Sequence, residues 1–148
     1  MDAAGARVID LIFGRWRSQI LYAGVKLGVF DALVSGPASA VRVASALQVA
    51  AGMLYRLMRA LGSLELLHEE QQQRFSLTPM GECLRRDHPQ TLRGMPLLEE
   101  GPEHYAAGTH LPTLITAGQQ DALVRAHGHP CSSMRSSTPA MKPCFTRP

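Results

Sequence analysis

Histidine is the residue type of this chain best suited to metal binding or acid–base catalysis. His127 and His129 stand two residues apart, His104 and His110 lie upstream, and Cys131 follows. Imidazole and thiolate groups are the usual ligands of zinc. Residues two apart point to different faces of a helix, however, and the run HGHP is typical of a turn. We therefore predict ordinary loop histidines, with no metal ligand and no catalytic residue in the chain.

Two arginines raise the possibility of nucleic-acid binding. Arg56 and Arg59 could reach bases or phosphates if the segment 52–61 were a recognition helix. The hairpin expected next carries Glu69 and Glu70, whose carboxylates repel a phosphate backbone. We prefer burial of this helix on more than one side by its apolar residues, which are Met53, Leu54, Tyr55, Leu57, Met58 and Leu61. We predict no nucleic-acid partner; a winged-helix transcription regulator is the alternative function.

The overall charge agrees with that prediction. The chain has 15 Lys and Arg against 12 Asp and Glu, a formal net charge of +3. Arg135, Lys142 and Arg147 supply the whole difference, so the body before Pro130 is balanced at 12 against 12. A balanced body has no basic footprint for phosphates.

Aromatic residues gather on the first segment, where Phe13, Trp16 and Tyr22 lie. Residues with large apolar side chains recur there at three- and four-residue steps: Val8, Ile9, Ile12, Phe13, Trp16, Ile20 and Leu21. This spacing predicts a helix over 6–24 with one broad apolar stripe. Two interpretations stay open: the stripe packs in the chain's own core, or it is buried against a second chain.

The rest of the pattern predicts the elements around that helix. Two further helices are expected before Gly62, then two short extended runs around QQQ that form a β-hairpin. Thr78 is a candidate N-cap, with Pro79 at the first helical position. Further helices are expected over 89–100 and 102–117. The order helix, helix, helix, hairpin indicates a mainly α, winged-helix-like domain with one small β-hairpin.

Composition limits the class of protein. A chain of 148 residues with 45% hydrophobic and 18% charged residues is typical of one globular domain. No apolar run approaches the roughly 20 residues that cross a bilayer, and the first residues do not form a secretory signal. Cys83, Cys131 and Cys144 follow no metal spacing and are odd in number, which indicates thiols in a reducing compartment. We expect a cytoplasmic protein with no membrane partner.

Several segments together resemble a known family. FGRWRSQILYAGVKLGVFDAL, LYRLMRALGSLELLHEE, RFSLTPMGECLRRDHPQTLRG and LITAG follow one another in this order. From about Arg7 to Pro130 they resemble the N-terminal dimerisation domain of the small-molecule O-methyltransferases that use S-adenosylmethionine (SAM), the acetylserotonin and caffeic-acid type with its bacterial natural-product branch. We therefore expect residues 1–130 to form a winged-helix-like dimerisation domain.

The resemblance implies a function for the leading helix. In the family this domain dimerises through its leading and trailing helices and lines the acceptor pocket, so Phe13 and Trp16 are the candidate substrate-binding residues. SAM belongs to a separate C-terminal domain with a Gly-x-Gly-x-Gly turn, and no such motif occurs here. We expect this chain to bind no SAM, to be inactive alone, and to form a homodimer or a heterodimer with an intact relative. The acceptor implied is a small aromatic or polyketide-like molecule.

The last residues, 131–148, show no periodic pattern. In a shifted reading frame the codons from Met141 to Phe145 can encode EAVF, which is similar to the family's own continuation. This favours a frame slip between Gly128 and Cys131 that leaves a truncated methyltransferase with a disordered, out-of-frame tail. An evolved disordered tail is the alternative, because its Ser, Pro and Lys content suits disorder equally well.

Overall fold

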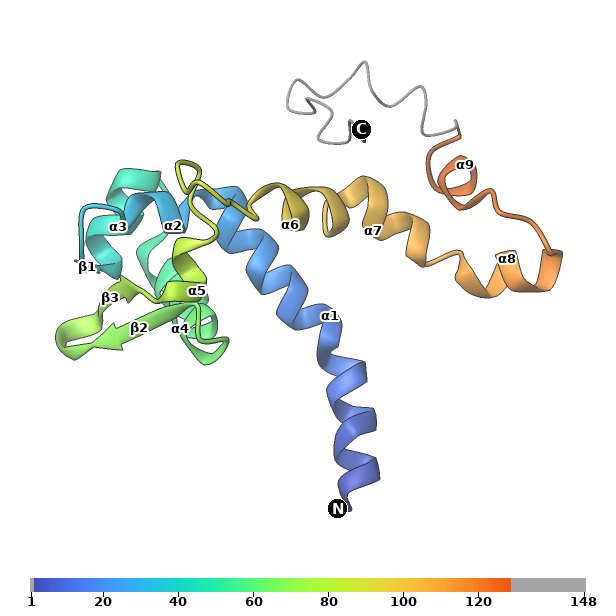
Figure 1. The fold of residues 1–148 in the computed structure, drawn as a ribbon, viewed down its shortest axis with the longest axis horizontal. Helices are drawn as coiled ribbons and strands as arrows, with labels where there is room; N and C mark the ends of the chain where they lie inside the picture. Colours follow the sequence, from blue (N-terminus) through green and yellow to red (C-terminus); the bar gives the residue numbers. More distant parts are fainter. Residues whose placement is uncertain (1, 129–148) are drawn as a thin grey trace. The chain divides into compact units, whose positions relative to one another are not determined.

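The computed structural model describes residues 2–128, and the chain divides into two compact units (Figure 1). The first unit ends at Glu100 and the second begins at Gly101. Residues 131–148 lie outside the described residues, as does His129. The out-of-frame tail therefore stays a prediction.

Helix α1 (Ala3–Leu27) opens the first unit. The carboxylate of Asp2 accepts a hydrogen bond from the N–H of Gly5 at 2.8 Å and caps the helix. The helix ends at Gly28, whose φ of +82° is a left-handed conformation that glycine adopts without strain. The helix predicted over 6–24 is confirmed and is three residues longer at each end.

Two helices, α2 (Val29–Ala32) and α4 (Ala51–Ser63), pack against α1, and α3 (Ala40–Leu47) packs against both of them. The Ser39 hydroxyl caps α3 by accepting a hydrogen bond from the N–H of Arg42 at 3.3 Å. Together these elements enclose the core of the unit, whose largest fully buried side chains are Phe30, Phe75, Leu33, Met58, Leu61, Val25, Val29 and Val43.

The predicted hairpin is present as β2 (Leu67–Glu70) and β3 (Arg74–Leu77), joined by a single 3₁₀ turn over Gln71–Gln73. The two strands pair antiparallel, with Glu70 opposite Arg74 at the turn end. Opposite charges placed across a strand pair favour this register.

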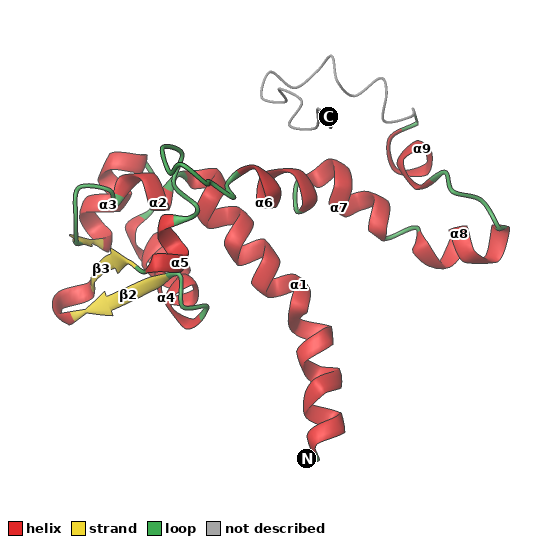
Figure 2. Ribbon diagram, viewed as in Figure 1, coloured by secondary structure: helices red, strands yellow, loops and turns green. Residues whose placement is uncertain are grey.

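A third strand, β1 (Ala38–Ser39), corrects the expectation of a hairpin alone. It pairs antiparallel with β3, placing Ala38 opposite Phe75 and giving the order β1-β3-β2 (Figure 2). The Arg74 guanidinium of β3 donates a hydrogen bond to the Pro37 carbonyl at 2.8 Å, which ties the residue before β1 to β3. A two-residue strand is too short for an alternating pattern, so the sequence did not indicate it.

Helix α5 (Pro79–Glu82) starts where the sequence predicts. The Thr78 hydroxyl accepts from the N–H of Gly81 at 3.1 Å and donates to the Glu65 carbonyl at 2.6 Å. One side chain therefore caps α5 and ties it to the residues before β2.

Helix α6 (Gly94–Glu99) is shorter than the helix predicted over 89–100. The Leu92 N–H donates to the Cys83 carbonyl at 2.8 Å, and the Thr91 hydroxyl donates to the Arg85 carbonyl at 2.6 Å. These hydrogen bonds to α5 and its loop occupy backbone groups that a longer helix would use.

The second unit contains α7 (Pro102–Gly108), α8 (Leu111–Ala117) and α9 (Ala122–His127), and α9 packs against α7. The prediction of one helix over 102–117 is wrong, because α7 ends at Gly108 and a new helix begins at Leu111. Pro112 has no N–H to donate, which a helix interior requires but the first turn of a new helix does not.

Candidate functional site

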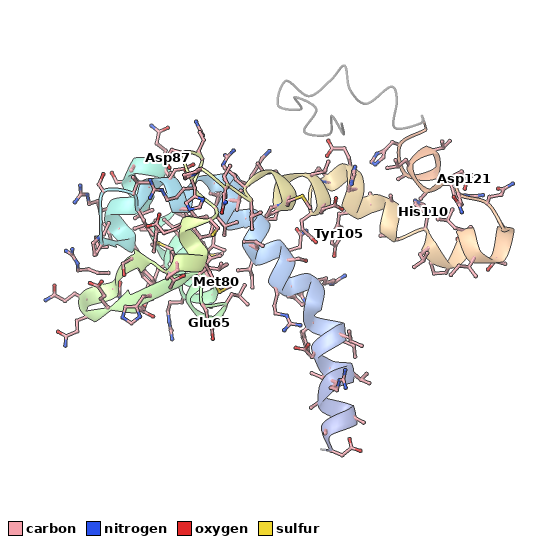
Figure 3. All side chains as sticks on the ribbon, viewed as in Figure 1. Glu65, Met80, Asp87, Tyr105, His110 and Asp121 are labelled. Carbon is pink, nitrogen blue, oxygen red and sulfur yellow. The ribbon has the colours of Figure 1, made fainter. Side chains whose placement is uncertain are left out.

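The first half of α1 carries six exposed large apolar side chains. They are Val8, Ile9, Leu11, Ile12, Phe13 and Trp16, with exposed fractions from 40% to 80%. We call these six residues the α1 apolar face. No residue from Ala3 to Arg17 is buried, and the side chains of this half stand clear of the helices and the sheet of the first unit (Figure 3). Such a surface on a helix marks an interaction site.

The C-terminal half of the same helix is anchored in the core. Val25 is buried, and a Cβ at Gly24 would lie 2.9 Å from Cδ1 of Leu61 on α4, so the two helices are in close contact there. The Gln19 side chain donates to the backbone and carboxylate oxygens of Glu100 at 3.0 and 3.1 Å. These contacts hold α1 while its first half projects.

Polar interactions on the first half of α1 stay within the helix. Arg17 and Asp10 form an ion pair at 2.7 Å, and the hydrogen bond from Arg17 holds the pKa of Asp10 below its ordinary value. The guanidinium of Arg15 lies 5.3 Å from the centroid of the Trp16 ring. Of these groups, only Arg15 lies over a residue of the α1 apolar face.

Both predicted substrate-binding residues lie on this face. Phe13 is 54% exposed and Trp16 is 56% exposed, so the structure brings them together on one exposed surface. The interpretation in which these two rings pack in the chain's own core is wrong. Burial begins further along the stripe, where Ile20 and Leu21 pack against the core.

The arginines of α4 do not form a free basic surface. Arg59 pairs with Glu69 at 3.4 Å and lies 5.9 Å from the Tyr55 ring centroid, while the Tyr55 hydroxyl donates to Glu69 at 3.0 Å. That hydrogen bond raises the pKa of Tyr55. Arg56 is exposed. The Glu69 carboxylate of β2 thus engages Arg59, one of the two candidate DNA-reading side chains.

The described histidines are dispersed over both units: His68 lies on β2 and His88 follows α5 in the first unit, and the other three lie in the second. His104 lies on α7, His110 precedes α8, and Nε2 of His127 lies 2.8 Å from the Glu103 carbonyl. Within residues 2–128 no three His, Cys, Asp or Glu side chains come close enough to hold a metal ion. None of the helices in this range is both long and apolar enough for a membrane span.

Sequence reasoning missed a second apolar feature of the first unit. A surface hollow of about 250 Å³ is lined by Leu27, Val49, Ala50, Met53, Leu54 and Leu57, and we call it the α1/α4 hollow. The pattern predicted burial for Met53, which is wrong, since this side chain is 65% exposed. The lining comes from the end of α1, the residues before α4 and α4 itself. No local sequence pattern therefore indicates the hollow.

Curated relatives with similar sequences are bacterial methyltransferases. The 8-amino-8-demethylriboflavin N,N-dimethyltransferase of Streptomyces davaonensis is 35% identical over 99 residues, covering 67% of this chain and 28% of that protein. The 3-amino-4-hydroxybenzoate 4-O-methyltransferase of Streptomyces cremeus is 36% identical over 93 residues, covering 62% of this chain and 26% of that protein. The chain thus matches between a quarter and a third of the length of these relatives.

Solved structures give the same assignment. The N,N-8-amino-8-demethyl-D-riboflavin dimethyltransferase from Streptomyces davawensis superposes with a TM-score of 0.84 at 30% identity, over 91% of this chain and 40% of that one. Human N-acetylserotonin methyltransferase gives a TM-score of 0.78 at 25% identity, over 92% and 41%. Residues 9–87 match the family described as O-methyltransferase dimerisation domain. With more than half of its residues in that match, this chain belongs to the O-methyltransferase dimerisation domain family.

Proposed function

We propose that this chain forms a homodimer through the α1 apolar face. A fully covered aromatic side chain buries roughly 150–250 Å² and an aliphatic one less, so the six exposed fractions amount to on the order of 600 Å². A stable interface buries about 800 Å² per partner. The projecting face therefore supplies most of one side of a dimer contact, and this is the observation that carries the proposal.

The energetics of α1 favour the same conclusion. An isolated helix shorter than about 12–15 residues is marginal in water, and most helical stability comes from tertiary packing. The first half of α1 has no such contact within the first unit, and its apolar residues spread over more than one side of the helix. A second chain laid over this half would supply the missing contacts.

A pair of substitutions tests the proposal. Ile12 and Val41 are both 63% exposed, so Ile12→Asp and Val41→Asp add the same charge at equal exposure on different helices. Sedimentation equilibrium should show a dimer for the unchanged chain. Ile12→Asp should raise the dissociation constant about 100-fold, since a buried unpaired carboxylate costs several kcal/mol and 1.4 kcal/mol is tenfold. Val41→Asp should not. A monomeric unchanged chain, or equal effects of both variants, would contradict the proposal.

The same face supports a substrate-lining role in an assembled methyltransferase. Phe13 and Trp16 offer exposed rings that suit a small aromatic or polyketide-like acceptor, since aromatic groups pair with one another beyond simple area burial. Quenching of Trp16 fluorescence by an added aromatic acceptor, lost in Phe13→Ala, would measure this contact. We infer that dimerisation with an intact relative would use the same surface. We also infer that the domain is winged-helix-like and that the protein is cytoplasmic.

SAM, the methyl donor of the family, does not fit the described residues. A dinucleotide-type site needs a glycine-rich turn between a parallel strand and a helix, whereas the sheet of residues 2–128 is antiparallel. The hollows of about 150 and 250 Å³ on the first unit lie below the roughly 300–1,000 Å³ of small-molecule sites. We assign no donor-binding residue within this range.

A further inference from the structure

The α1/α4 hollow has the chemistry of a socket for apolar side chains. All six lining residues are apolar, and two of them are open to solvent: Leu27 is 40% exposed and Met53 is 65% exposed. Small-molecule sites add a few polar groups that orient the ligand. The lining of this hollow has no such polar side chain, so the occupant that suits it is an apolar side chain of a protein.

One side of α1 carries residues of the α1 apolar face and a residue that lines the hollow. Ile9, Trp16, Ile20 and Leu27 follow one another at steps of seven, four and seven residues, which places them on the same side of the helix. Ile9 lies at the exposed end and Leu27 lines the hollow. At a rise of 1.5 Å per residue their Cα atoms are about 27 Å apart along the axis.

We propose that the α1/α4 hollow receives Ile9 from α1 of a second copy of this chain, in an antiparallel pairing of the two α1 helices. This rests on the proposed dimerisation. A two-fold interface is reciprocal, so Ile9 of each copy lies in the hollow of the other beside Leu27. The centre of the pairing then falls at Ser18, which places Trp16 against Ile20 of the second copy. One arrangement thus fills both hollows and covers the side of each α1 helix that carries Ile9 and Trp16.

Disulfide trapping between two differently tagged chains tests this arrangement. One chain carries Ile9→Cys and the other Met53→Cys, with Cys83, Cys131 and Cys144 replaced by Ser in both. Since α1 separates Ile9 from the hollow by about 27 Å within one chain, a link must join two copies. After mixing and mild oxidation we expect a cross-linked species containing one of each tag. The control replaces Met53→Cys by Met80→Cys on α5, which is 53% exposed and should give no link.

Each outcome distinguishes the docking from the dimer. Sedimentation of the same mixtures before oxidation reports whether dimers form. Dimers that give no Ile9–Met53 link, or that link equally to Met80, would overturn the docking and leave dimerisation standing. Monomers throughout would overturn the proposed function and the docking with it. A link from Met53→Cys to Ile115→Cys in place of Ile9→Cys would assign the hollow to α8 and overturn the proposal.

Discussion

At the scale of single residues, Gly81 is the position where a side chain is least tolerable. It is buried in α5, and a Cβ there would lie 2.1 Å from the Leu66 carbonyl oxygen, a backbone atom that cannot rotate away. We expect Gly81→Ala to lower the free energy of unfolding by about 3 kcal/mol, because either α5 or the residues before β2 must shift. Urea denaturation followed by circular dichroism measures the change.

Gly52 gives the matched control for that substitution. It lies in the first turn of α4, and a Cβ there would have no neighbour within 4 Å. Gly52→Ala should leave stability unchanged or raise it by up to about 1 kcal/mol, since alanine reduces the entropy of the unfolded chain. Equal destabilisation by both substitutions would show that the close approach at Gly81 is not the cause.

The sequence predicted that the two aromatic residues of the candidate site share one side of a helix, but it did not predict what lies beside them. The three- and four-residue spacing predicted that Phe13 and Trp16 share one side of a helix, and that prediction is confirmed. Whether this side faces the core depends on where α4 and α6 pack along α1, and contacts such as Gln19 to Glu100 join residues far apart in sequence. Spacing alone therefore left both interpretations of the stripe open.

At the scale of elements, the ion pair between Asp10 and Arg17 lies on the exposed half of α1. Its contribution to stability should depend on pH. The pKa of Asp10 is lowered in the folded chain, chiefly by the hydrogen bond from Arg17. A lowered carboxyl pKa contributes stability above the unfolded value of about 3.9 and loses it as the pH falls through the folded value. The contribution should therefore disappear below about pH 4.

Arg17→Gln tests this assignment directly. It should return the pKa of Asp10 toward the ordinary aspartate value, as followed by NMR of the side-chain carboxyl carbon. Arg15→Gln is the control, because Arg15 lies over the Trp16 ring instead of pairing with Asp10. If Arg17→Gln left the Asp10 titration unchanged, the pair would not exist in solution.

Elements with strong local signals were predicted well, and elements set by long-range contacts were not. Helices α1 and α4, the β2/β3 hairpin and the Thr78 cap all follow from periodicity or from turn and cap residues within a few positions. Strand β1 depends on pairing with β3, more than thirty residues later. Helix α6 starts late because Leu92 bonds back to Cys83. Such contacts leave no periodic trace in the sequence.

At the scale of the whole molecule, the distribution of apolar residues explains why a partner is needed. The first unit has its own core, which extends from α1 to Leu84 after α5, yet the α1 apolar face lies outside it. In the described part of the second unit the large apolar residues Leu111, Ile115 and Val124 are also exposed, at 57%, 74% and 42%. A chain with this much uncovered apolar surface is expected to gain stability by association.

That gain should make unfolding depend on chain concentration. Association stabilises the folded state by mass action, and a hundredfold dilution well above the dissociation constant removes about 2.7 kcal/mol. We expect the midpoint of thermal unfolding to fall by roughly 5 °C over such a dilution. When dilution continues below the dissociation constant, Trp16, the single tryptophan, should also shift its emission to longer wavelength, because the dimers dissociate and water reaches its ring. Ile12→Asp should show neither dependence below its own, roughly 100-fold higher dissociation constant, because it is monomeric there. Identical midpoints and identical emission at both concentrations in the unchanged chain would mean that the α1 apolar face is not covered by a second copy.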